Sequence, residues 1–280
     1  MRARKRFGQH YLDANWAQRL VTALRLESAD TVVEIGPGRG ALTFPLARAA
    51  RQVTAIEVDR DLVEWLAPRL PANVRLVEGD ILNIPFDVLA PPGTAPGTAR
   101  IVGNLPYNLS TPILFRLLAM HLATGRIRDA TVMLQREVAD RLVATPGSKA
   151  YGILSIFLQL HADMSMLLAL PPGAFRPVPQ VSSAVVRLSF RAPAVDIHDR
   201  ELFDTIVRSI FAHRRKTVGN ALKALALVHG ADALSALRLA GIDPTRRPET
   251  LCLNELAALA CRFAGDRGED SVRSRPSGPS

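Results

Sequence analysis

The sequence predicts an α/β fold with a mostly parallel, doubly wound sheet, followed by a small domain made only of helices. Short β-branched segments alternate with amphipathic segments between residues 31 and 190. The composition shifts at residues 191–194, and beyond them only helical spacing of apolar residues remains. At 280 residues the chain is also near the length at which one core divides into two. We therefore predict a sheet domain over 1–192, a helical domain over 193–264, and a disordered tail over 265–280.

The first half of the sheet domain is predicted to consist of strand–helix units. Asp13 is placed to cap an opening helix, in which Trp16, Leu20 and Leu24 recur at helical spacing. Residues 90–99 contain mainly Ala, Pro, Gly and Thr and are predicted to form a surface loop of low complexity. The other elements are strands at 31–35, 52–58, 74–77 and 100–103, and helices at 41–49, 61–70 and 113–121.

The second half continues this alternation and then changes to helices alone. A proline-bounded loop is expected at 171–179, between two strands. The predicted elements are strands at 130–134, 164–170 and 181–190, and helices at 137–143 and 152–161. In the helical domain, the apolar residues that follow helical spacing are Leu202, Ile206, Ile210, Leu222, Leu225, Leu253, Leu256 and Leu259.

The charge balance favours a polyanionic partner. Lys and Arg number 35 against 26 Asp and Glu, and the sequence pI is about 10.5. Such an excess suits nucleic acid above all, or an anionic membrane surface, although solubility alone is the simpler explanation. No apolar run of roughly 18 residues is present to span a bilayer, and the basic start lacks the apolar region of a secretory signal. We expect a cytoplasmic protein.

Cysteine and histidine give no sign of a metal site. Cys252 and Cys261 lie in an apolar helical stretch and are predicted to be small buried side chains of a reducing compartment. The six histidines show no ligand spacing. We therefore predict neither a disulfide framework nor a bound metal.

A glycine-rich stretch after the first predicted strand indicates a nucleotide-like cofactor. Gly36 and Gly38 with Ala41 satisfy one dinucleotide pattern, and with Gly40 they satisfy another glycine pattern. Glu57 follows Gly36 by 21 residues, where a carboxylate accepts hydrogen bonds from ribose hydroxyls. This combination implies an adenosine-bearing cofactor, and leaves NAD and S-adenosylmethionine both open.

Three further features favour the methyl donor. Glu34, two residues before the first glycine, is placed to face a cationic amino-acid tail. Asp80 ends the third predicted strand, where it can accept a hydrogen bond from an adenine amino group or merely cap a helix at Ile81. Residues 104–107, Asn-Leu-Pro-Tyr, follow a buried strand at the edge where open α/β sheets bind ligands, although an ordinary turn has the same composition.

Nine short segments, which occur in the same order as in a known protein family, carry a resemblance to that family. They are Phe7-Gly8-Gln9-His10-Tyr11-Leu12, Glu34-Ile35-Gly36-Pro37-Gly38, Glu57-Val58-Asp59, Gly79-Asp80, Asn104-Leu105-Pro106-Tyr107-Asn108, Gln135-Arg136-Glu137-Val138-Ala139, Pro146-Gly147-Ser148-Lys149-Ala150-Tyr151, Phe175-Arg176-Pro177-Val178-Pro179 and Arg214-Arg215-Lys216-Thr217. With them the chain resembles the S-adenosylmethionine-dependent rRNA adenine N6-dimethyltransferases, and within that family the bacterial small-subunit branch.

The resemblance implies a Rossmann-like methyltransferase fold and a specific activity. That activity is N6,N6-dimethylation of two adjacent adenosines near the 3′ end of 16S rRNA, in an immature small ribosomal subunit. S-adenosyl-L-methionine is the implied cofactor, and the cofactor-binding positions implied here are His10, Leu12, Gly36, Gly38, Glu57, Asp80 and Asn104. His10 stands where Asn is usual in the family. We expect a monomer.

The residues suggest how the chemistry is catalysed. The exocyclic amine of adenine is a poor nucleophile, so a catalyst must orient its lone pair toward the methyl group. Asn104 offers a side-chain carbonyl, and the backbone carbonyl of Leu105 or Pro106 offers a second acceptor. Tyr107 and Phe175 are predicted to stack on the base, although Phe175 can also be a core aromatic.

RNA binding is assigned to two basic clusters, both of which can instead be ordinary solvated charge. They are Arg4, Lys5 and Arg6 near the start of the chain, and Arg214, Arg215 and Lys216 between two apolar helical runs. Arg246 and Arg247 are weaker candidates.

Three other functions remain open. One is a related enzyme that modifies large-subunit rRNA and confers macrolide resistance. Another is an NAD-dependent oxidoreductase, for which no hydride-transfer residues are visible. A third is a non-catalytic ribosome-assembly factor that binds RNA. Intact Glu57, Asp80 and Asn104 argue against a pure binding protein.

Overall fold

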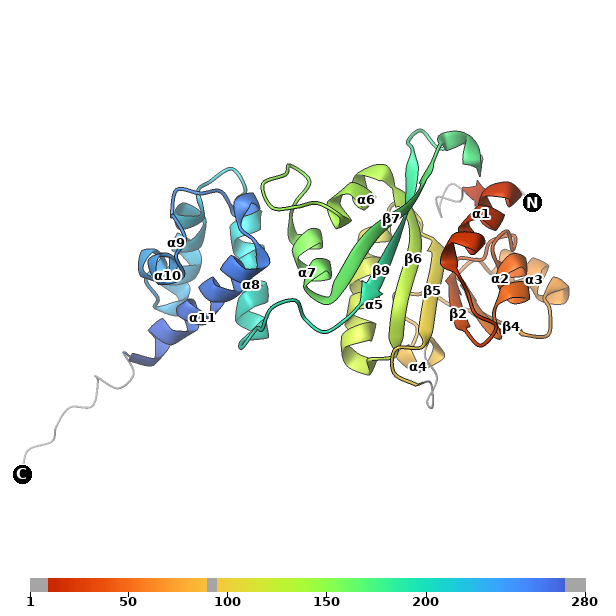
Figure 1. The fold of residues 1–280 in the computed structure, drawn as a ribbon, viewed down its shortest axis with the longest axis horizontal. Helices are drawn as coiled ribbons and strands as arrows, with labels where there is room; N and C mark the ends of the chain where they lie inside the picture. The colour runs from red at the N-terminus through yellow and green to blue at the C-terminus, as the bar shows by residue number, and fades with distance from the viewer. Residues whose placement is uncertain (1–9, 90–94, 270–280) are drawn as a thin grey trace, which may run out of the picture. The chain divides into compact units, whose positions relative to one another are not determined.

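The computed structural model describes residues 10–89 and 95–269, which form two compact units (Figure 1). The first unit contains the described residues up to Val143 together with His161–Ala192. The second unit contains Ala144–Leu160 and the described residues from Pro193 onward. In the described part of the chain, no helix is both long and apolar enough to cross a membrane.

The first unit is built on a seven-stranded sheet with the order β4-β3-β2-β5-β6-β9-β7. Strands β4 to β6 are parallel, and β9 runs antiparallel to both of its neighbours. Helices cover both faces, so the predicted mostly parallel, doubly wound sheet is confirmed (Figure 1). The strands are β2 (Thr31–Ile35), β3 (Gln52–Glu57), β4 (Val74–Glu78), β5 (Ala99–Asn104), β6 (Ile127–Gln135), β7 (Ala162–Leu170) and β9 (Ser183–Phe190).

The helices of this unit agree with the predicted ones to within a few residues, except for α4, which was not predicted. Helix α1 begins where predicted, because the Asp13 carboxylate accepts a hydrogen bond from the backbone N–H of Asn15 at 2.9 Å. The helices are α1 (Ala14–Leu24), α2 (Thr43–Ala49), α3 (Arg60–Leu66), α4 (Phe86–Leu89), α5 (Ser110–Thr124) and α6 (Arg136–Leu142). Part of the predicted loop at 90–99 lies outside the described residues, and β5 takes its last residue, Ala99.

The strand order creates a place for a ligand. The chain moves outward from β2 to β3 and β4, and then returns to place β5 on the other side of β2. The loops that leave the carboxyl ends of β2 and β5 therefore turn away from each other. Open α/β sheets bind their ligands in the crevice that forms at such a point.

A second, two-stranded sheet joins distant parts of the chain. Strand β1 (Tyr11–Leu12) pairs antiparallel with β8 (Phe175–Arg176), with Leu12 opposite Phe175. Leu12 and Phe175 are buried in one core cluster together with the inner face of α1, including Leu20 and Leu24. This pairing was not predicted, and it fixes residues 10–12, called the N-terminal segment below, beside the loop at 171–179.

The second unit is helical but is not one continuous stretch of the chain. It comprises α8 (Arg200–Ala212), α9 (Val218–His229), α10 (Ala233–Leu239) and α11 (Leu253–Glu269), joined by residues 144–160 with most of α7 (Ile153–His161). The predicted boundary at 192 assigned residues 144–160 to the sheet domain. The structure differs because Phe157 of α7 packs edge-on against Phe203 of α8, with ring centres 6.3 Å apart.

Two other features of the second unit differ from expectation. Helix α11 continues to Glu269, whereas the tail was predicted to begin at residue 265. Cys261 on α11 is exposed and Cys252 is only partly buried, so the prediction of two buried cysteines is wrong; both are free. Residues 270–280 lie outside the described part of the chain.

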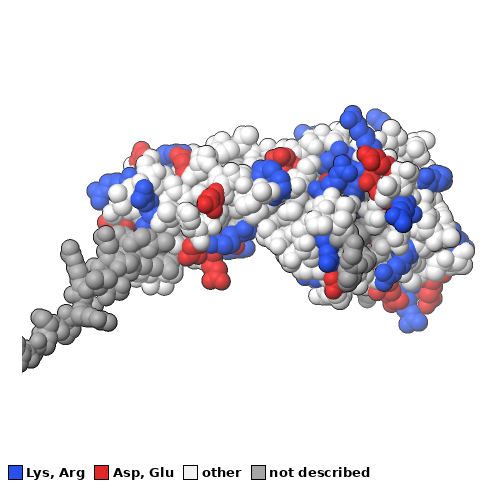
Figure 2. All heavy atoms as spheres, turned by 60° about the horizontal axis from the view of Figure 1, so that its bottom comes forward, with Lys and Arg blue, Asp and Glu red and all other residues white. Residues whose placement is uncertain are grey.

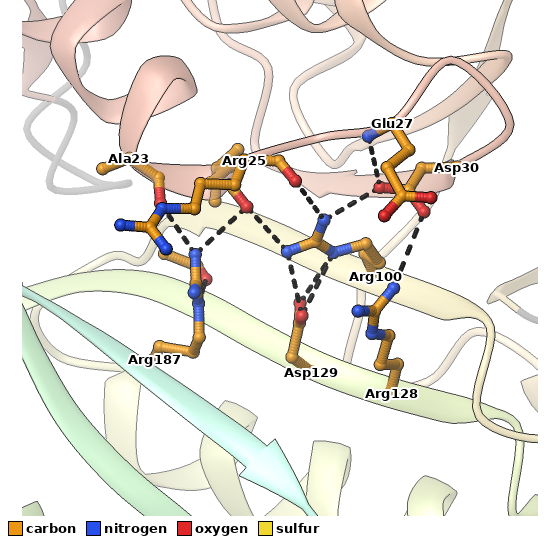
Figure 3. Close-up of polar contacts among 10 residues, drawn as sticks. Ala23, Arg25, Glu27, Asp30, Arg100, Arg128, Asp129 and Arg187 are labelled. Carbon is orange, nitrogen blue, oxygen red and sulfur yellow. Dashed lines mark hydrogen bonds and ion pairs between the residues drawn. The ribbon is translucent and has the colours of Figure 1, made fainter.

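A buried ion-pair network fastens α1 to the sheet (Figure 3). Arg100, near the start of β5, donates through Nε and Nη2 to Asp129 of β6 and through Nη1 to Asp30 at 2.8 Å. Its Nη2 also donates to the Leu24 carbonyl at 2.9 Å, and its Nη1 to that of Arg25 at 3.4 Å. All five N–H groups of the guanidinium are thus used, on the last turn of α1 and on two carboxylates.

We predict that Arg100→Met destabilises the protein severely. Without Arg100, Asp129 loses its ion-pair partner and Asp30 keeps only the longer contact with Arg128 at 3.9 Å. Removing one partner from a buried ion pair costs about 3–5 kcal/mol. Denaturant unfolding should show that loss. The matched control is Arg136→Met, whose partner is Asp140 and whose side chain is 51% exposed; it should cost less than about 1 kcal/mol. Equal losses in the two variants would contradict a structural role for the network.

Candidate active site

The largest concentration of predicted site residues lines one cavity of the first unit. The cavity lies at the carboxyl ends of β2 to β5 and contains about 1130 Å³ of empty space, including its open side. The predicted residues that line it are His10, Leu12, Gly36, Gly38, Glu57, Asp80, Asn104, Leu105, Pro106 and Tyr107.

The glycine loop (residues 36–40) connects β2 to α2 and lets the chain pass close to the cavity. Gly38 has a φ of 56°, a left-handed conformation that glycine adopts without strain. A Cβ atom on Gly38 would also lie 3.2 Å from the Tyr11 ring of the N-terminal segment. The guanidinium of Arg39 also lies over the Tyr11 ring, 4.8 Å from the ring centre. Tyr11 and Arg39 line the cavity but were not predicted as site residues, although Tyr11 lies in a segment that carries the family resemblance and Arg39 lies in the glycine loop.

Glu57, at the end of β3, is a buried carboxylate held by backbone N–H groups. Its Oε2 accepts from Gly38 at 3.0 Å, and its Oε1 accepts from Val58 and Asp59, each at 3.0 Å. Burial raises the pKa of Glu57, and these three N–H groups oppose the rise. Oε2 accepts only one of these hydrogen bonds, so it can accept another from a ligand hydroxyl.

Asp80 stabilises a turn and does not cap a helix at Ile81, which was one of the two roles considered for it in the sequence analysis. Its Oδ1 accepts from the backbone N–H of Leu82 at 3.0 Å, and its Oδ2 accepts from the Asn83 side chain at 2.9 Å. The next helix, α4, begins only at Phe86. Each carboxylate oxygen keeps one acceptor position, so the turn does not exhaust the side chain.

The Asn104 side chain is oriented by the N-terminal segment. Its Nδ2 donates to the backbone carbonyl of His10 at 2.7 Å, which leaves Oδ1 as the group that can accept from a ligand. The carbonyl of Pro106 already accepts from Leu109 N and Ser110 Oγ, both at 3.0 Å. Both acceptor positions of the Pro106 carbonyl oxygen are therefore occupied. The Leu105 carbonyl is the better candidate for the second group, beside Asn104 Oδ1, that accepts a hydrogen bond from a ligand amine.

The aromatic residues are arranged differently from expectation. Tyr107 lines the cavity, and its hydroxyl forms a hydrogen bond with Ser183 Oγ at 2.9 Å. Phe175 does not line the cavity: it is 0% exposed in the core beside Leu12, so a buried Phe175 cannot stack on a base in this structure. The ring that faces Tyr107 is instead His10, with centres 5.4 Å apart and planes 23° apart.

Glu34 is the most unusual group of the cavity. It is 1% exposed at the carboxyl end of β2, and its Oε2 is buried with no hydrogen-bond partner. Burial raises the pKa of Glu34 to about 8; the Thr43 hydroxyl opposes this and the Glu57 charge adds to it. The sequence placed Glu34 next to the cofactor but gave no sign that its carboxyl lacks a partner.

The predicted RNA-binding residues of the second unit lie between α8 and α9. Arg215 and Lys216 are exposed, whereas Arg214 donates to the Lys149 carbonyl at 3.1 Å. Arg246 is engaged in an ion pair with Glu255. Figure 2 shows basic side chains spread over one face rather than gathered in a single patch. Arg4, Lys5 and Arg6 lie outside the described residues. Among those described, no cluster of His, Cys, Asp or Glu could hold a metal ion.

The chain is similar to several known proteins. The model of the family described as Ribosomal RNA adenine dimethylase matches residues 1–251. The Ribosomal RNA small subunit methyltransferase A of Chromohalobacter salexigens is 46% identical over 267 residues, covering 94% of this chain and 92% of the relative.

Solved structures show the same fold. A dimethyladenosine transferase from Plasmodium falciparum has a TM-score of 0.73 at 22% identity, covering 92% of this chain and 98% of that one. The 23S rRNA methyltransferase ErmE has a TM-score of 0.64 at 25% identity, covering 91% and 99%.

We predict that Glu34 makes the ligand-free protein less stable as the pH rises. The folded protein keeps the Glu34 proton up to about pH 8, whereas the unfolded chain loses it near the ordinary value of 4.5. The free energy of unfolding should therefore fall between these values, by an amount on the order of a few kcal/mol, and then level off. Chemical unfolding between pH 5 and pH 9 measures it. Glu34→Gln should flatten the slope; an unchanged slope would mean that Glu34 does not titrate as inferred.

Proposed function

The chain belongs to the ribosomal RNA adenine dimethylase family, and from that membership we propose that it transfers methyl groups from S-adenosylmethionine to the N6 amines of two adjacent adenosines near the 3′ end of 16S rRNA. The observation that supports the chemistry best is the fixed amide of Asn104, at the carboxyl end of β5 and in the same cavity as the glycine loop and Glu57. The proposed substrate is an immature small ribosomal subunit.

The residues of the cavity fit the methyl donor. Gly38 leaves room beside Tyr11 where a Cβ atom would be crowded, and Glu57 Oε2 has capacity for a ribose hydroxyl. Asp80 retains acceptor positions for an adenine amino group. The donor supplies a methyl group activated by attachment to a positively charged sulfur. We assign the cofactor-binding role to His10, Leu12, Gly36, Gly38, Glu57, Asp80 and Asn104.

Catalysis is proposed to consist of orienting the amine. Asn104 Oδ1 accepts one N–H of the adenine amine and the Leu105 carbonyl accepts the other, so the nitrogen lone pair points at the methyl group. Because Nδ2 of Asn104 is committed to His10, its amide cannot rotate without losing that hydrogen bond. No covalent intermediate with the enzyme is required. The monomethylated amine keeps one N–H and therefore one of these acceptors.

The target base must leave its helix to reach the cavity. Unstacking costs roughly a few kcal/mol, and stacking on an aromatic side chain returns about 1–3 kcal/mol. Tyr107 is the ring that we assign to this role, since it lines the cavity and its hydroxyl is anchored by Ser183. Pro106 restricts the backbone of the same loop.

RNA affinity is proposed to come from exposed basic residues. Arg215 and Lys216 are available for phosphate contacts, and Arg214 holds the neighbouring loop through the Lys149 carbonyl. Arg4, Lys5 and Arg6 are assigned to the same function on their charge alone.

The other candidate functions have less support. The chain is much more similar to the small-subunit relative than to the 23S enzyme. The oriented amide of Asn104 has no use in a protein that only binds RNA. Incubation with labelled S-adenosylmethionine and either free 16S rRNA or immature small subunits, followed by mapping of the modified bases, tests the donor, the base and the substrate together.

We predict that Asn104→Ala lowers the rate of methylation by roughly two to three orders of magnitude, the usual cost of losing one preorganised hydrogen-bonding group in an active site. S-adenosylmethionine should remain bound, because most cofactor contacts come from other residues. Single-turnover methylation with calorimetric binding measures both. Asn254→Ala, on the exposed surface of α11, is the control. An unchanged rate in the Asn104 variant would refute the proposed mechanism.

Replacing Arg215 and Lys216 together with Ala should weaken RNA binding and make it less dependent on salt. Each lost phosphate contact reduces the slope of log K against log salt by about 1. Binding titrations at several salt concentrations provide the slope. The double variant Arg51→Ala and Arg75→Ala removes the same charge from exposed positions near the starts of β3 and β4, at the sheet edge opposite the cavity. If both double variants reduce the slope of log K against log salt by the same amount, net charge rather than a specific interface is responsible.

A further inference from the structure

We infer that Arg176, on strand β8, binds a phosphate next to the target adenosine and so holds the flipped nucleotide at the mouth of the cavity. This inference rests on the proposed function, because it takes RNA as the substrate whose base enters the cavity. It adds an RNA-binding residue to the first unit, whereas the exposed basic residues at 215 and 216 belong to the second.

The pairing of β1 with β8 places Arg176 at the rim of the cavity. Tyr11 and Arg176 lie directly opposite each other, so their side chains project from the same face of this two-stranded sheet. Leu12 and Phe175 form the other cross-strand pair, project from the opposite face and are buried in the core. The Tyr11 ring lines the cavity and Arg176 is exposed. The outer face of the two-stranded sheet therefore carries an exposed guanidinium beside the cavity wall.

The loop that follows β8 is fixed at both of its ends. At the first end, His10 Nδ1 donates to the Pro177 carbonyl at 2.7 Å, and the His10 ring stacks on Tyr107, the ring assigned to the target base. At the second end, the Ser182 carbonyl accepts from the backbone N–H of Arg136 at 3.0 Å. The two-stranded sheet thus presents its outer face from a fixed position, and little ordering is required when RNA binds.

The Arg176 guanidinium keeps the donors that a phosphate requires. Its Nη1 donates to the carbonyls of Gly173 at 3.1 Å and Phe175 at 2.9 Å. Within the described part of the chain, Nε and Nη2 form no hydrogen bond, and no Asp or Glu forms an ion pair with this side chain. Nε and Nη2 together form the edge of the planar group that makes bidentate contacts with phosphate.

A nucleotide whose base enters the cavity supplies the missing anion. Its phosphates stay at the mouth, because a negative charge is costly to bury and the cavity already contains the carboxyl groups of Glu57 and Asp80. Of the described residues that line the cavity, only Arg39 is an Arg or Lys, and its guanidinium lies over the Tyr11 ring. The exposed edge of Arg176 is therefore the better phosphate ligand at this rim.

Neutral linkages in the RNA test the contact directly. A synthetic 3′ fragment with the two target adenosines is made with a charge-neutral methylphosphonate in place of one phosphate at a time, on either side of each adenosine. Ligation places each fragment in full-length 16S rRNA. Binding and single-turnover methylation are then measured with the unmodified protein, Arg176→Gln and Arg176→Lys. Arg75→Gln is the matched control, because Arg75 is exposed on β4 and does not line the cavity.

The expected results follow from the loss of one contact. Arg176→Gln should bind natural RNA about tenfold more weakly, because a charge-assisted pair of hydrogen bonds is lost. One neutral linkage should weaken binding of the unmodified protein to a similar extent, but by less than about twofold in the Gln variant, because that phosphate has already lost its partner. Arg176→Lys should recover part of the affinity, since it restores the charge without the planar edge. S-adenosylmethionine should bind to all variants equally.

Other outcomes overturn the inference in distinguishable ways. If the losses from Arg176→Gln and from every neutral linkage multiply, Arg176 contacts none of these phosphates. An equal loss in Arg75→Gln would assign the effect to net charge. Weaker binding of S-adenosylmethionine by Arg176→Gln would mean that the side chain supports the pairing of β1 with β8 instead. Neutral linkages that leave binding of the unmodified protein unchanged would exclude the contact, whether or not the variants fold.

Failure of the proposed function has a separate signature. An unmodified protein that shows the expected coupling between Arg176 and one phosphate but transfers no methyl group would refute the function and leave the inference standing. Methylation without that coupling would refute the inference alone. No binding of 16S rRNA by the unmodified protein would refute both.

Discussion

Strand β5 is tied at both ends to the segment that contains α1, and the geometry of the site depends on these two ties. At the start of the strand, Arg100 donates to the Leu24 carbonyl in the last turn of α1. At its end, Asn104 donates to the His10 carbonyl, just before α1 begins. A six-residue strand and an eleven-residue helix are thereby joined into a closed frame. The Asn104 amide, to which we assign the orientation of the substrate, is consequently held by the whole frame and not by its loop alone.

Two carboxyl groups in one cavity illustrate how surroundings separate similar side chains. Glu34 is the penultimate residue of β2, Glu57 is the last residue of the neighbouring β3, and burial raises the pKa of both. Glu57 receives three backbone N–H groups, which stabilise its charge in the absence of a ligand. Glu34 receives no such support at Oε2. One of the three N–H groups on Glu57 comes from Gly38 in the glycine loop, and the other two come from Val58 and Asp59, directly after β3.

Local patterns were sufficient to predict the seven strands of the main sheet and the glycine loop, whereas His10 and Leu12 were predicted to belong to the site only through the family resemblance. β-branched runs such as Thr31–Ile35 reveal a buried strand through their own side chains, and the spacing from Gly36 to Glu57 reflects one strand–helix–strand unit. Phe175 could not be placed in this way. Its burial follows from pairing with Leu12, far away in the sequence, and no periodicity encodes such a pair. The lack of a hydrogen-bond partner for Glu34 Oε2 likewise depends on which residues pack around it in the folded protein, and no local pattern encodes them.

The position of α7 has a consequence for the order in which the protein can be completed during translation. Phe157 leaves the ribosome roughly 45 residues before Phe203, the α8 residue on which it packs. At about 5–20 residues per second, α7 therefore waits several seconds for its partner. The strands β7 and β9 are synthesised during that interval, so the sheet can close while one apolar helix is still uncovered. Until Phe203 is synthesised, Phe157 lacks the aromatic side chain on which it packs in the folded helical unit.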